Sequence, residues 1–379
     1  MHICFITHEY PKKGFPHGGI GSFVQTLAKA CVAQGVTVTV VGIGYTHTYE
    51  EAVDCGVHIY RIARSNAKFG KFIDNSKKIN HTLKEIHEKT PIDIIEGAEL
   101  EFAFIKKIPA VKYVIRMHGG HHFFAKTLHK EVNKWKAFKE KRSFLKADFF
   151  IAVSDFVGIK TAELLNRKIK YKRIYNFVDI AKFKSEVGIN VDDNKITFIG
   201  TVCEKKGVRQ LIQAMPLINQ AFPNAYLEVI GRDWFFPNGK SYIAFLKETV
   251  ANADFKNINF RGVVSYEQIP LYIDTAKLCV FPSHMESFGL TIIEAMAMNK
   301  PIVVSDIAPF KEIVGKTNSV LFCNPQSPED IAEKVIYSLQ HQKEIKDKAN
   351  LAKKRIVNMF SKDKIIKENI AYFKSICKI

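Results

Sequence analysis

The sequence predicts an α/β protein of two doubly wound parallel-sheet domains that face each other across a cleft. The chain has 379 residues, which is more than one small hydrophobic core needs. Short β-branched runs alternate with amphipathic helical patterns through the first half, pause over a polar segment, and then alternate again. This alternation is typical of a Rossmann-like parallel sheet covered by helices on both faces.

The first domain is predicted to span residues 1–178. Its strands are expected where β-branched runs are bounded by glycine, proline or polar residues. These runs are Ile3–Thr7, Thr37–Val41, Val57–Ile62, Ile92–Glu96, Val111–Met117, Phe149–Val153 and Lys172–Tyr175. Amphipathic helices are expected between them, including Ser22–Gln34 and Lys126–Lys146.

A polar segment with little periodicity, residues 179–194, is predicted to be the interdomain linker. The second domain is predicted to span residues 195–359, with a long helical tail from about Pro328. Its expected strands are Lys195–Gly200, Ala225–Gly231, Ile258–Gly262, Leu278–Phe281, Pro301–Ser305 and Ser319–Phe322. Ligands of open parallel sheets bind beyond the carboxyl ends of the strands, so functional residues are expected where strands end and helices begin.

The charge points to an anionic partner. The chain has 56 basic and 38 acidic residues, a net charge of +18, and residues 1–180 hold 29 of the basic and 17 of the acidic ones. A phosphorylated ligand, an acidic lipid and a nucleic acid all fit such an excess, and a general surplus for solubility is the alternative. No recognised nucleic-acid-binding module is present, so we do not expect a nucleic-acid partner.

The composition favours a cytoplasmic protein. No apolar run reaches the roughly 18–20 residues that span a bilayer, and Met1–Thr7 lacks the basic region of a signal peptide. The seven cysteines are scattered and none forms a C-x-x-C pair. We therefore expect reduced, mostly buried thiols rather than a disulfide framework or a zinc site.

Two strands of the first domain are followed by loops that contain glycine: one holds Gly18, Gly19 and Gly21, and the other begins His118-Gly119-Gly120. Gly18, Gly19 and Gly21 lie between the first strand and a helix, but their spacing matches neither the dinucleotide fingerprint nor a Walker loop. A phosphate-binding loop and a structural glycine turn both remain open. His118 ends the Val111–Met117 strand and is placed to hydrogen-bond a ligand, or is a satisfied structural histidine.

The histidines that follow, His121 and His122, invite a metal interpretation. Neighbouring residues point apart in any regular element, and no i, i+4 pair of histidines occurs here. We therefore expect no metal site.

The second domain has similar strand-end loops. Thr201 follows its first strand, and Lys205 or Lys206 ahead of Gly207 could neutralise a diphosphate. The alternative is an ordinary solvated lysine. Gly231 ends the next strand and carries little information alone.

The stretch from Glu286 to Glu294 holds two carboxylates eight positions apart. Ser287 is expected to cap a helix that begins near Phe288, so Glu286 lies in the loop and Glu294 in the helix. The backbone N–H groups of residues 288–290 would then form an anion-binding helix start. A carboxylate on each side could accept hydrogen bonds from ligand hydroxyls, although two solvent-facing glutamates are the alternative.

This set of motifs resembles the GT-B retaining glycosyltransferases, in the family 4-like form of bacterial polysaccharide and glycan biosynthesis. Glu286 and Glu294 match the E-x7-E signature of that family. The remaining motifs occur in the family's order across nearly the whole chain: Tyr10-Pro11, Gly18-Gly19, His118, Asn176-Phe177-Val178-Asp179, Lys206-Gly207, Gly231 and Pro301-Ile302-Val303-Val304-Ser305.

The resemblance implies a role for each matched residue. His118, Lys206 and Glu286 would be catalytic, with Glu286 holding the donor sugar and Lys206 stabilising the departing diphosphate. Glu294 would bind the ribose hydroxyls. The full donor-binding set would be Gly18, Gly19, Thr201, Lys206, Gly231, Glu286, Ser287, Phe288, Gly289, Leu290 and Glu294. The C-terminal helix, residues 360–379, would complete the first domain.

Three positions depart from the family pattern. Thr201 stands where an arginine is usual, which removes one charge that neutralises the diphosphate, and Lys205 or Arg209 could replace it. Phe177 replaces the glycine of the hinge motif, and the Asn299-Lys300 pair replaces the glycine before Pro301. The last two changes are not expected to alter the chemistry.

The expected reaction moves a hexosyl group from a UDP- or GDP-sugar to a hydroxyl of a glycan or lipid-linked glycan, in cell-surface polysaccharide synthesis. The resemblance implies front-face substitution with retention, in which the leaving phosphate takes the acceptor proton. No D-x-D pair occurs in the sequence, so neither a metal nor another cofactor is expected. A non-catalytic or epimerase-type GT-B relative is the alternative, and a basic nucleic-acid-binding protein is a remote one.

The acceptor is expected on the first domain, where Glu96, Glu99 and Glu101 follow a strand. A basic segment with interleaved aromatics could contact an anionic membrane on its cytoplasmic face, unless it is a solvated helix. The residues of this expected contact are Lys130, Lys134, Trp135, Phe138, Lys141 and Arg142. The oligomeric state is left open.

Overall fold

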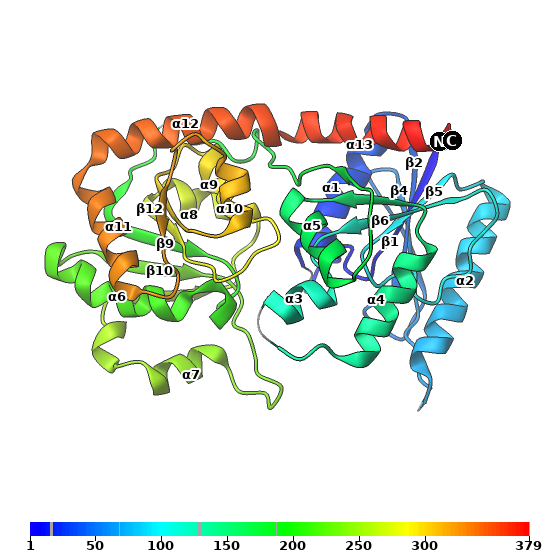
Figure 1. Ribbon diagram of the computed structural model, residues 1–379, viewed down its shortest axis with the longest axis horizontal. Coiled ribbons are helices and arrows are strands. Elements are labelled where there is room, and N and C mark those ends of the chain that lie inside the picture. Colours follow the sequence, from blue (N-terminus) through cyan, green and yellow to red (C-terminus); the bar gives the residue numbers. More distant parts are fainter. Residues whose placement is uncertain (16–17, 68, 128–129, 187, 379) are drawn as a thin grey trace. The chain divides into compact units, whose positions relative to one another are not determined.

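The computed structural model describes residues 1–15, 18–67, 69–127, 130–186 and 188–378. The chain forms two compact units (Figure 1). Unit 1 comprises Met1–Asn176 and Asp363–Ile379, and unit 2 comprises Phe177–Lys362. The predicted linker, residues 179–194, is wrong at its end, because Asp192 to Asn194 already belong to a strand.

Unit 1 is built on an eight-stranded sheet in the order β3-β4-β2-β1-β5-β6-β7-β8. Its strands are β1 (His2–Ile6), β2 (Thr37–Ile43), β3 (Glu50–Asp54), β4 (Val57–Ile62), β5 (Ile94–Gly97), β6 (Lys112–Met117), β7 (Phe149–Ala152) and β8 (Lys172–Arg173). All neighbouring pairs are parallel except β3 with β4. In the central register, Phe5 lies opposite Val40 in β2 and Glu96 in β5.

The sequence pattern missed strand β3. This strand forms a hairpin with β4 through Cys55 and Gly56, which both have positive φ. It lies at the sheet edge with alternating intermediate and exposed residues, and four of its five positions are polar or small. Charged residues on an edge strand hinder pairing with other chains, and they also remove the apolar signal by which strands are found.

The helices of unit 1 are α1 (Gly19–Ala33), α2 (Lys71–Lys89), α3 (His121–Thr127), α4 (Lys134–Lys146), α5 (Asp155–Leu164) and α13 (Lys362–Cys377). The single helix predicted over Lys126–Lys146 is therefore wrong. Its residues 128–129 lie outside the described residues, and α4 starts separately because the Asn133 side chain accepts a hydrogen bond from the backbone N–H of Lys136.

The C-terminal helix α13 belongs to unit 1 although it follows unit 2 in the sequence. It buries Ile365, Ile366, Ile370 and Phe373 at helical spacing. Its predicted start at residue 360 is two residues early, because Phe360 ends α12.

Unit 2 has a six-stranded parallel sheet in the order β11-β10-β9-β12-β13-β14. Its strands are β9 (Asp192–Ile199), β10 (Tyr226–Ile230), β11 (Ile258–Gly262), β12 (Ala276–Phe281), β13 (Ile302–Ser305) and β14 (Leu321–Cys323). Its helices are η1 (Glu204–Lys206), α6 (Val208–Ala221), α7 (Tyr242–Thr249), η2 (Asn252–Phe255), α8 (Ile269–Asp274), α9 (Leu290–Ala297), α10 (Ala308–Val314), α11 (Pro328–Gln340) and α12 (Gln342–Phe360).

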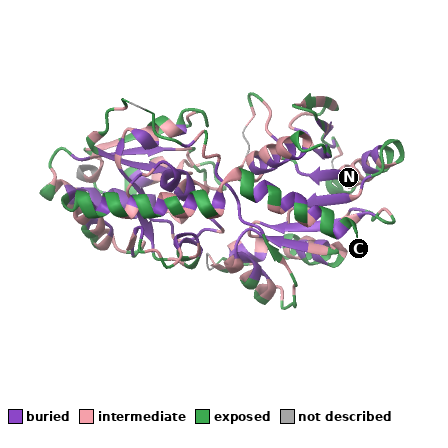
Figure 2. Ribbon diagram, turned by 90° about the horizontal axis from the view of Figure 1, so that it is seen from above, coloured by how far each residue is buried: buried purple, intermediate pink, exposed green. Residues whose placement is uncertain are grey.

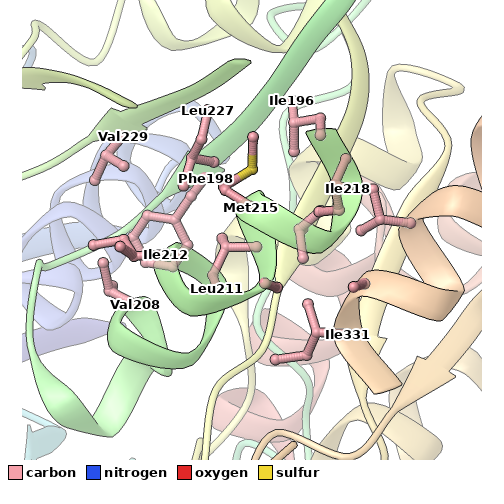
Figure 3. Packing of buried hydrophobic residues seen from close by; sticks show 14 of the residues in the cluster. Ile196, Phe198, Val208, Leu211, Ile212, Met215, Ile218, Leu227, Val229 and Ile331 are labelled. Carbon is pink, nitrogen blue, oxygen red and sulfur yellow. The ribbon is translucent and has the colours of Figure 1, made fainter. Parts of the chain in front are cut away.

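The core of unit 2 forms where α6 covers the sheet (Figure 3). Val208, Leu211, Ile212, Met215 and Ile218 recur at helical spacing and face strand residues such as Phe198 and Leu227. Each apolar side chain buried in this way contributes roughly 1.5–3 kcal/mol. This layer holds the strand ends, and therefore the loops that follow them, in fixed positions.

In both units the central strands are buried and the outer faces of the helices are exposed (Figure 2), whereas the edge strands β3, β8 and β11 have exposed residues. Among the residues that the structure describes, no helix combines the length and apolar character needed to cross a membrane. Both units thus have the parallel-sheet α/β construction that the alternation predicted.

Candidate functional site

The loop between β12 and α9 begins the candidate site in unit 2. Gly289 caps α9 with φ +115°, and a Cβ at this position would lie 2.8 Å from the Phe310 ring. The helix therefore begins at Leu290, and the prediction that Ser287 is the cap is wrong. The N–H groups without a helical acceptor are those of residues 289–292, which shifts the predicted anion-binding helix start by one to two residues.

Glu286 and Lys206 come together in this loop region. The Lys206 ammonium donates a hydrogen bond to Glu286 Oε1, and Ser283 Oγ donates to the same oxygen at 3.3 Å. The Lys206 side chain is 20% exposed and that of Glu286 is 12% exposed. The two side chains are held by each other yet can still be reached from solvent.

The backbone explains why Lys206 and Glu286 meet. Gly207 follows η1 with φ +69°, and any Cβ there would collide with the Pro282 carbonyl. His284 N–H donates to the Lys205 carbonyl at 2.9 Å, and the His284 ring bonds Gln210 at 3.1 Å. These hydrogen bonds hold the loop of Lys206 and Gly207 after β9 against the loop after β12.

Glu294 lies inside α9 and is almost fully buried. Its Oε1 accepts a hydrogen bond from Tyr266 Oη at 2.9 Å. Burial raises the pKa of Glu294 to about 7, against the opposing effects of the Tyr266 hydrogen bond and the Lys182 charge. This carboxylate therefore titrates near neutral pH.

Tyr266 and Lys182 were not predicted as site residues. Lys182 Nζ lies 3.6 Å from the centre of the Tyr266 ring, which is a cation–π contact. Both residues lie in loops and match no motif, so their proximity to Glu294 could be found only from the tertiary structure.

Other predicted donor-binding residues lie on the same sheet edge. Thr201 follows β9 and is partly exposed. Gly231 packs directly on the Gly200 carbonyl, where a Cβ would collide, so it has a packing role. Arg209 is bound by Glu204 through two of its guanidinium nitrogens, so it does not stand free to replace the arginine missing at position 201.

Unit 1 contributes the predicted glycine loop and His118. Gly18 precedes α1 as its cap, and Gly19 is the first residue of that helix, while residues 16–17 lie outside the described part of the chain. His118 follows β6 and contacts Phe23 edge-on, with 5.7 Å between ring centres. Burial, and secondarily the charge of Arg116, lowers the pKa of His118 to about 3, so its imidazole is neutral.

The three predicted acceptor carboxylates differ in their surroundings. Glu96 is buried and accepts two hydrogen bonds from Arg116, at 2.7 and 3.0 Å, so its assignment to the acceptor is wrong. Glu99 is also buried and accepts from the Gly119 N–H at 2.7 Å, so it orders the turn after His118 instead. Burial, with a smaller effect of Glu140, raises the pKa of Glu99 to about 8. Glu101 lines a cavity.

The histidines after His118 have separate partners. His121 Nε2 accepts from the Asn133 N–H at 2.9 Å, and His122 Nδ1 is hydrogen-bonded to the buried Glu140 carboxylate. Within the described ranges, no group of three or more histidine, cysteine or acidic side chains could hold a metal ion. Whether the reaction uses a metal stays a prediction.

The predicted membrane-contact residues lie on and before α4, where they join an aromatic cluster. Trp135 stacks on Phe138 with 5.6 Å between ring centres and on Phe104 with 5.7 Å, and Phe72 of α2 meets Trp135 edge-on at 4.8 Å. Trp135, Phe138 and Phe72 are exposed. Exposed basic residues accompany this aromatic cluster: Lys130, Lys134, Lys141 and Arg142.

Two family models match this chain and between them cover most of it. The model described as Glycosyltransferase Family 4 matches residues 17–182, and that of Glycosyl transferases group 1 matches residues 179–355. An uncharacterised glycosyltransferase of Methanocaldococcus jannaschii is 26% identical over 99% of this chain and 98% of its own length.

Solved structures of the same architecture align over nearly the full chain. Sucrose-phosphate synthase from Thermosynechococcus elongatus superposes with a TM-score of 0.85 at 17% identity, covering 99% of this chain and 98% of that one. Anabaena HepE, solved in complex with UDP-glucose, gives 0.76 at 17% identity, covering 99% and 100%. The fold, the order of the motifs and the two matching models show that this chain belongs to the GT-B glycosyltransferases of the family 4-like group.

Proposed function

We propose that the protein transfers a hexosyl group from a nucleotide-diphosphate sugar to a hydroxyl of a glycan or lipid-linked glycan, with retention of the anomeric configuration. The observation that carries this proposal is the arrangement around the start of α9. Lys206 and Glu286 meet in front of the helix start, and Glu294 lies in the same helix with Tyr266 bound to it. These groups match the parts of a nucleotide sugar.

Each group suits one part of the donor. Glu294 would accept hydrogen bonds from the ribose hydroxyls, and Glu286 from hydroxyls of the sugar. Lys206 and the N–H groups at the start of α9 would bind the diphosphate. The complex of HepE with UDP-glucose supports a UDP-sugar as the first donor to test, and a GDP-sugar is the second.

The chemistry requires stabilisation of the leaving diphosphate. Negative charge grows on its oxygens as the anomeric bond breaks, so positive groups placed there in advance lower the barrier. Lys206 would break its contact with Glu286 to bind the phosphate, which leaves Glu286 free for the sugar. In the proposed front-face reaction the acceptor oxygen attacks from the leaving-group side, and the departing phosphate takes the acceptor proton. No metal is part of this proposal.

His118 would act as a neutral hydrogen-bonding group toward the sugar. A pKa of about 3 keeps the imidazole uncharged at neutral pH, so it can donate through one nitrogen and accept through the other. Glu99 fixes the turn after it through the Gly119 N–H. A neutral donor close to the reacting carbon avoids placing a second positive charge beside an electron-poor centre.

A binding and activity experiment tests this proposal. UDP-, GDP-, ADP- and dTDP-sugars are screened by thermal shift, since a ligand of the native state raises the melting temperature. The anomeric configuration of the product is then read by NMR. We expect one donor to stabilise the protein, Glu286→Ala to abolish most transfer while the fold is kept, and the product to retain the donor configuration. An inverted product would refute the retaining mechanism, and absence of any donor binding would favour the non-catalytic alternative.

We also propose that the aromatic cluster of Phe72, Phe104, Trp135 and Phe138 contacts an anionic membrane and brings the enzyme to a lipid-linked acceptor. Exposed aromatic rings beside lysines suit the membrane interface, where rings insert among headgroups and ammonium groups meet phosphates. This would place the protein on the cytoplasmic face of the cell membrane.

Vesicle flotation tests the membrane contact. Wild-type protein should float with phosphatidylglycerol vesicles at low salt and much less with neutral vesicles. Trp135→Ala with Phe138→Ala should reduce flotation several-fold, whereas Leu351→Ala, which removes an exposed apolar side chain of α12, should not. Equal flotation of all variants, or none by wild type, contradicts the proposed contact.

A further inference from the structure

A cavity of about 370 Å³ opens at the carboxyl edge of the unit 1 sheet. The residues that line it come from the ends of β1, β2, β4 and β5 and from helix α2. Polar side chains of four of them face the space: His8, Arg64, Asn75 and Glu101. Its volume falls in the range of roughly 300–1,000 Å³ that is typical of small-molecule sites.

Arg64 supplies a fixed positive charge to this cavity. Its Nε donates to the Gly44 carbonyl at 2.8 Å, and its backbone N–H donates to the Thr46 carbonyl at 3.1 Å. Within the described residues its two terminal nitrogens have no protein partner. A guanidinium held at Nε with its terminal N–H groups unused is well suited to bind phosphate or carboxylate in two parallel hydrogen bonds.

The other polar groups suit hydroxyls. His8 Nδ1 lies 3.7 Å from Glu101 Oε1, and this nearby carboxylate raises the pKa of His8. Asn75 Oδ1 accepts from the Ser65 N–H at 2.9 Å, which leaves the Asn75 amide NH₂ to donate. A carboxylate, an imidazole and an amide at the rim of one cavity can bind a polyhydroxylated ring from several sides.

The cavity adjoins the glycine loop of the same unit. His8 Nε2 lies 3.9 Å from Glu9 Oε1, and the Glu9 carboxylate packs against Gly18, the residue that caps α1. A ligand held at His8 and Glu101 would therefore lie beside the glycine loop of unit 1.

We propose that this cavity is the acceptor subsite and that it takes a sugar carrying an anionic group, either a phosphate or a carboxylate. Arg64 binds the anion, while Glu101, His8 and Asn75 bind ring hydroxyls. This inference rests on the proposed transferase function, because it assigns the second substrate of that reaction. The anion can come from a soluble sugar phosphate or from a phosphorylated lipid headgroup, which share the same chemistry.

Calorimetric titration tests the assignment. The ligands are glucose 6-phosphate, glucuronate, glucose and dihexanoyl phosphatidylinositol, each titrated into wild type, Arg64→Gln and Arg64→Lys. The matched control is Arg167→Gln, which removes an exposed arginine of the same unit outside this cavity. We expect Arg64→Gln to weaken binding of an anionic sugar by about 10- to 100-fold, the loss of one charge-assisted pair of hydrogen bonds. The affinity of Arg64→Lys for the anionic sugar should lie between those of wild type and Arg64→Gln, and the affinity of Arg167→Gln should equal that of wild type.

The outcomes separate this inference from the transferase function. Titration of UDP-glucose into the same preparations shows whether the donor site works. If a nucleotide sugar binds but no anionic sugar does, or if anionic sugars bind Arg64→Gln as well as wild type, the acceptor assignment is overturned and the transferase proposal stands. Binding of glucose 6-phosphate alone supports a soluble acceptor, and binding of the inositol lipid alone supports a lipid-linked one.

Discussion

Each unit holds an ion pair near the carboxyl ends of its parallel strands, and the two pairs differ in access to solvent. Arg116 and Glu96 in unit 1 are only 1% and 3% exposed, and Asn369 of α13 accepts a further hydrogen bond from Arg116 at 2.6 Å. Lys206 and Glu286 in unit 2 are 20% and 12% exposed. The first pair joins β5, β6 and α13, whereas the second joins the short helix η1 to the loop between β12 and α9.

This difference in exposure indicates that the first pair stabilises the fold, whereas the second can take part in ligand binding. A fully enclosed pair cannot exchange its partner for a ligand, and removal of one member leaves an uncompensated buried charge. A pair that solvent reaches can open when a ligand offers better partners. The exposure of the Lys206–Glu286 pair therefore lets it exchange a partner for a ligand, which the enclosed Arg116–Glu96 pair cannot do.

The largest effect on stability should follow from breaking the enclosed pair. Glu96→Gln leaves the Arg116 guanidinium buried without its counter-charge, and in the described part of the chain Arg116 Nη1 already has no partner. We expect unit 1 to lose about 3–5 kcal/mol of unfolding free energy. The chain has two tryptophans, and Trp135 lies in unit 1, so urea titration of a Trp234→Phe background reports this unit separately.

The control for that change is Glu101→Gln, which alters a partly exposed carboxylate of the same unit. Its effect should stay within about 0.5 kcal/mol, as is usual for surface substitutions. If both variants lost the same unfolding free energy, burial of Glu96 would not be the reason for its effect on stability.

The second prediction concerns the pH dependence of unit 2. The folded state raises the pKa of Glu294 from 4.5 to about 7, so between these values it binds more protons than the unfolded state does. Stability from this group is therefore present below pH 4.5 and is lost as the pH rises to about 7. Glu294→Gln should remove this loss, which is on the order of 3 kcal/mol.

This pH effect is measured by urea titration of a Trp135→Phe background, in which Trp234 reports unit 2. The difference in unfolding free energy between wild type and Glu294→Gln should change across pH 4.5–7 and be constant above pH 8. A difference that does not vary with pH would mean that Glu294 is not the titrating group.

The third prediction concerns the open pair. Lys206→Met should lower the transfer rate by about 100- to 1,000-fold, since it removes one group that stabilises the developing diphosphate charge. Its stability should fall by only about 1 kcal/mol, because Glu286 remains in contact with solvent. Lys240→Met breaks an exposed pair with Glu248 in the same unit and should affect neither quantity appreciably. A Lys206 variant with wild-type turnover would remove this pair from the mechanism.

The smallest effect is expected at Tyr266. Tyr266→Phe removes the hydrogen bond that orients Glu294 and opposes the rise of its pKa. Nucleotide affinity should fall by up to about tenfold, which corresponds to the loss of one hydrogen bond between a neutral donor and a charged acceptor. Without this hydrogen bond the pKa of Glu294 rises further, so the loss should be largest at and below neutral pH and should shrink at alkaline pH, where Glu294 is ionised in both proteins. A loss that is the same at every pH would indicate a packing role only.

Several elements were predictable because their pattern is local. Strand Val57–Ile62 and strand Ile258–Gly262 were predicted with the bounds that the structure shows. Their β-branched residues and flanking turn residues report the local backbone directly. The split between α3 and α4, and the start of α9 at Leu290, were missed because a cap and a left-handed glycine decide them.

The sequence by itself determined the fold class, the family and the strand-end positions of Lys206, Glu286 and Glu294, because periodicity and motif spacing are properties of the chain. Only the tertiary structure decided that Glu96 is enclosed by Arg116 while Glu286 stays accessible, that Tyr266 binds Glu294, and that Lys182 lies over the Tyr266 ring. Burial and charge pairing depend on residues far apart in sequence, and sequence spacing carries no record of them.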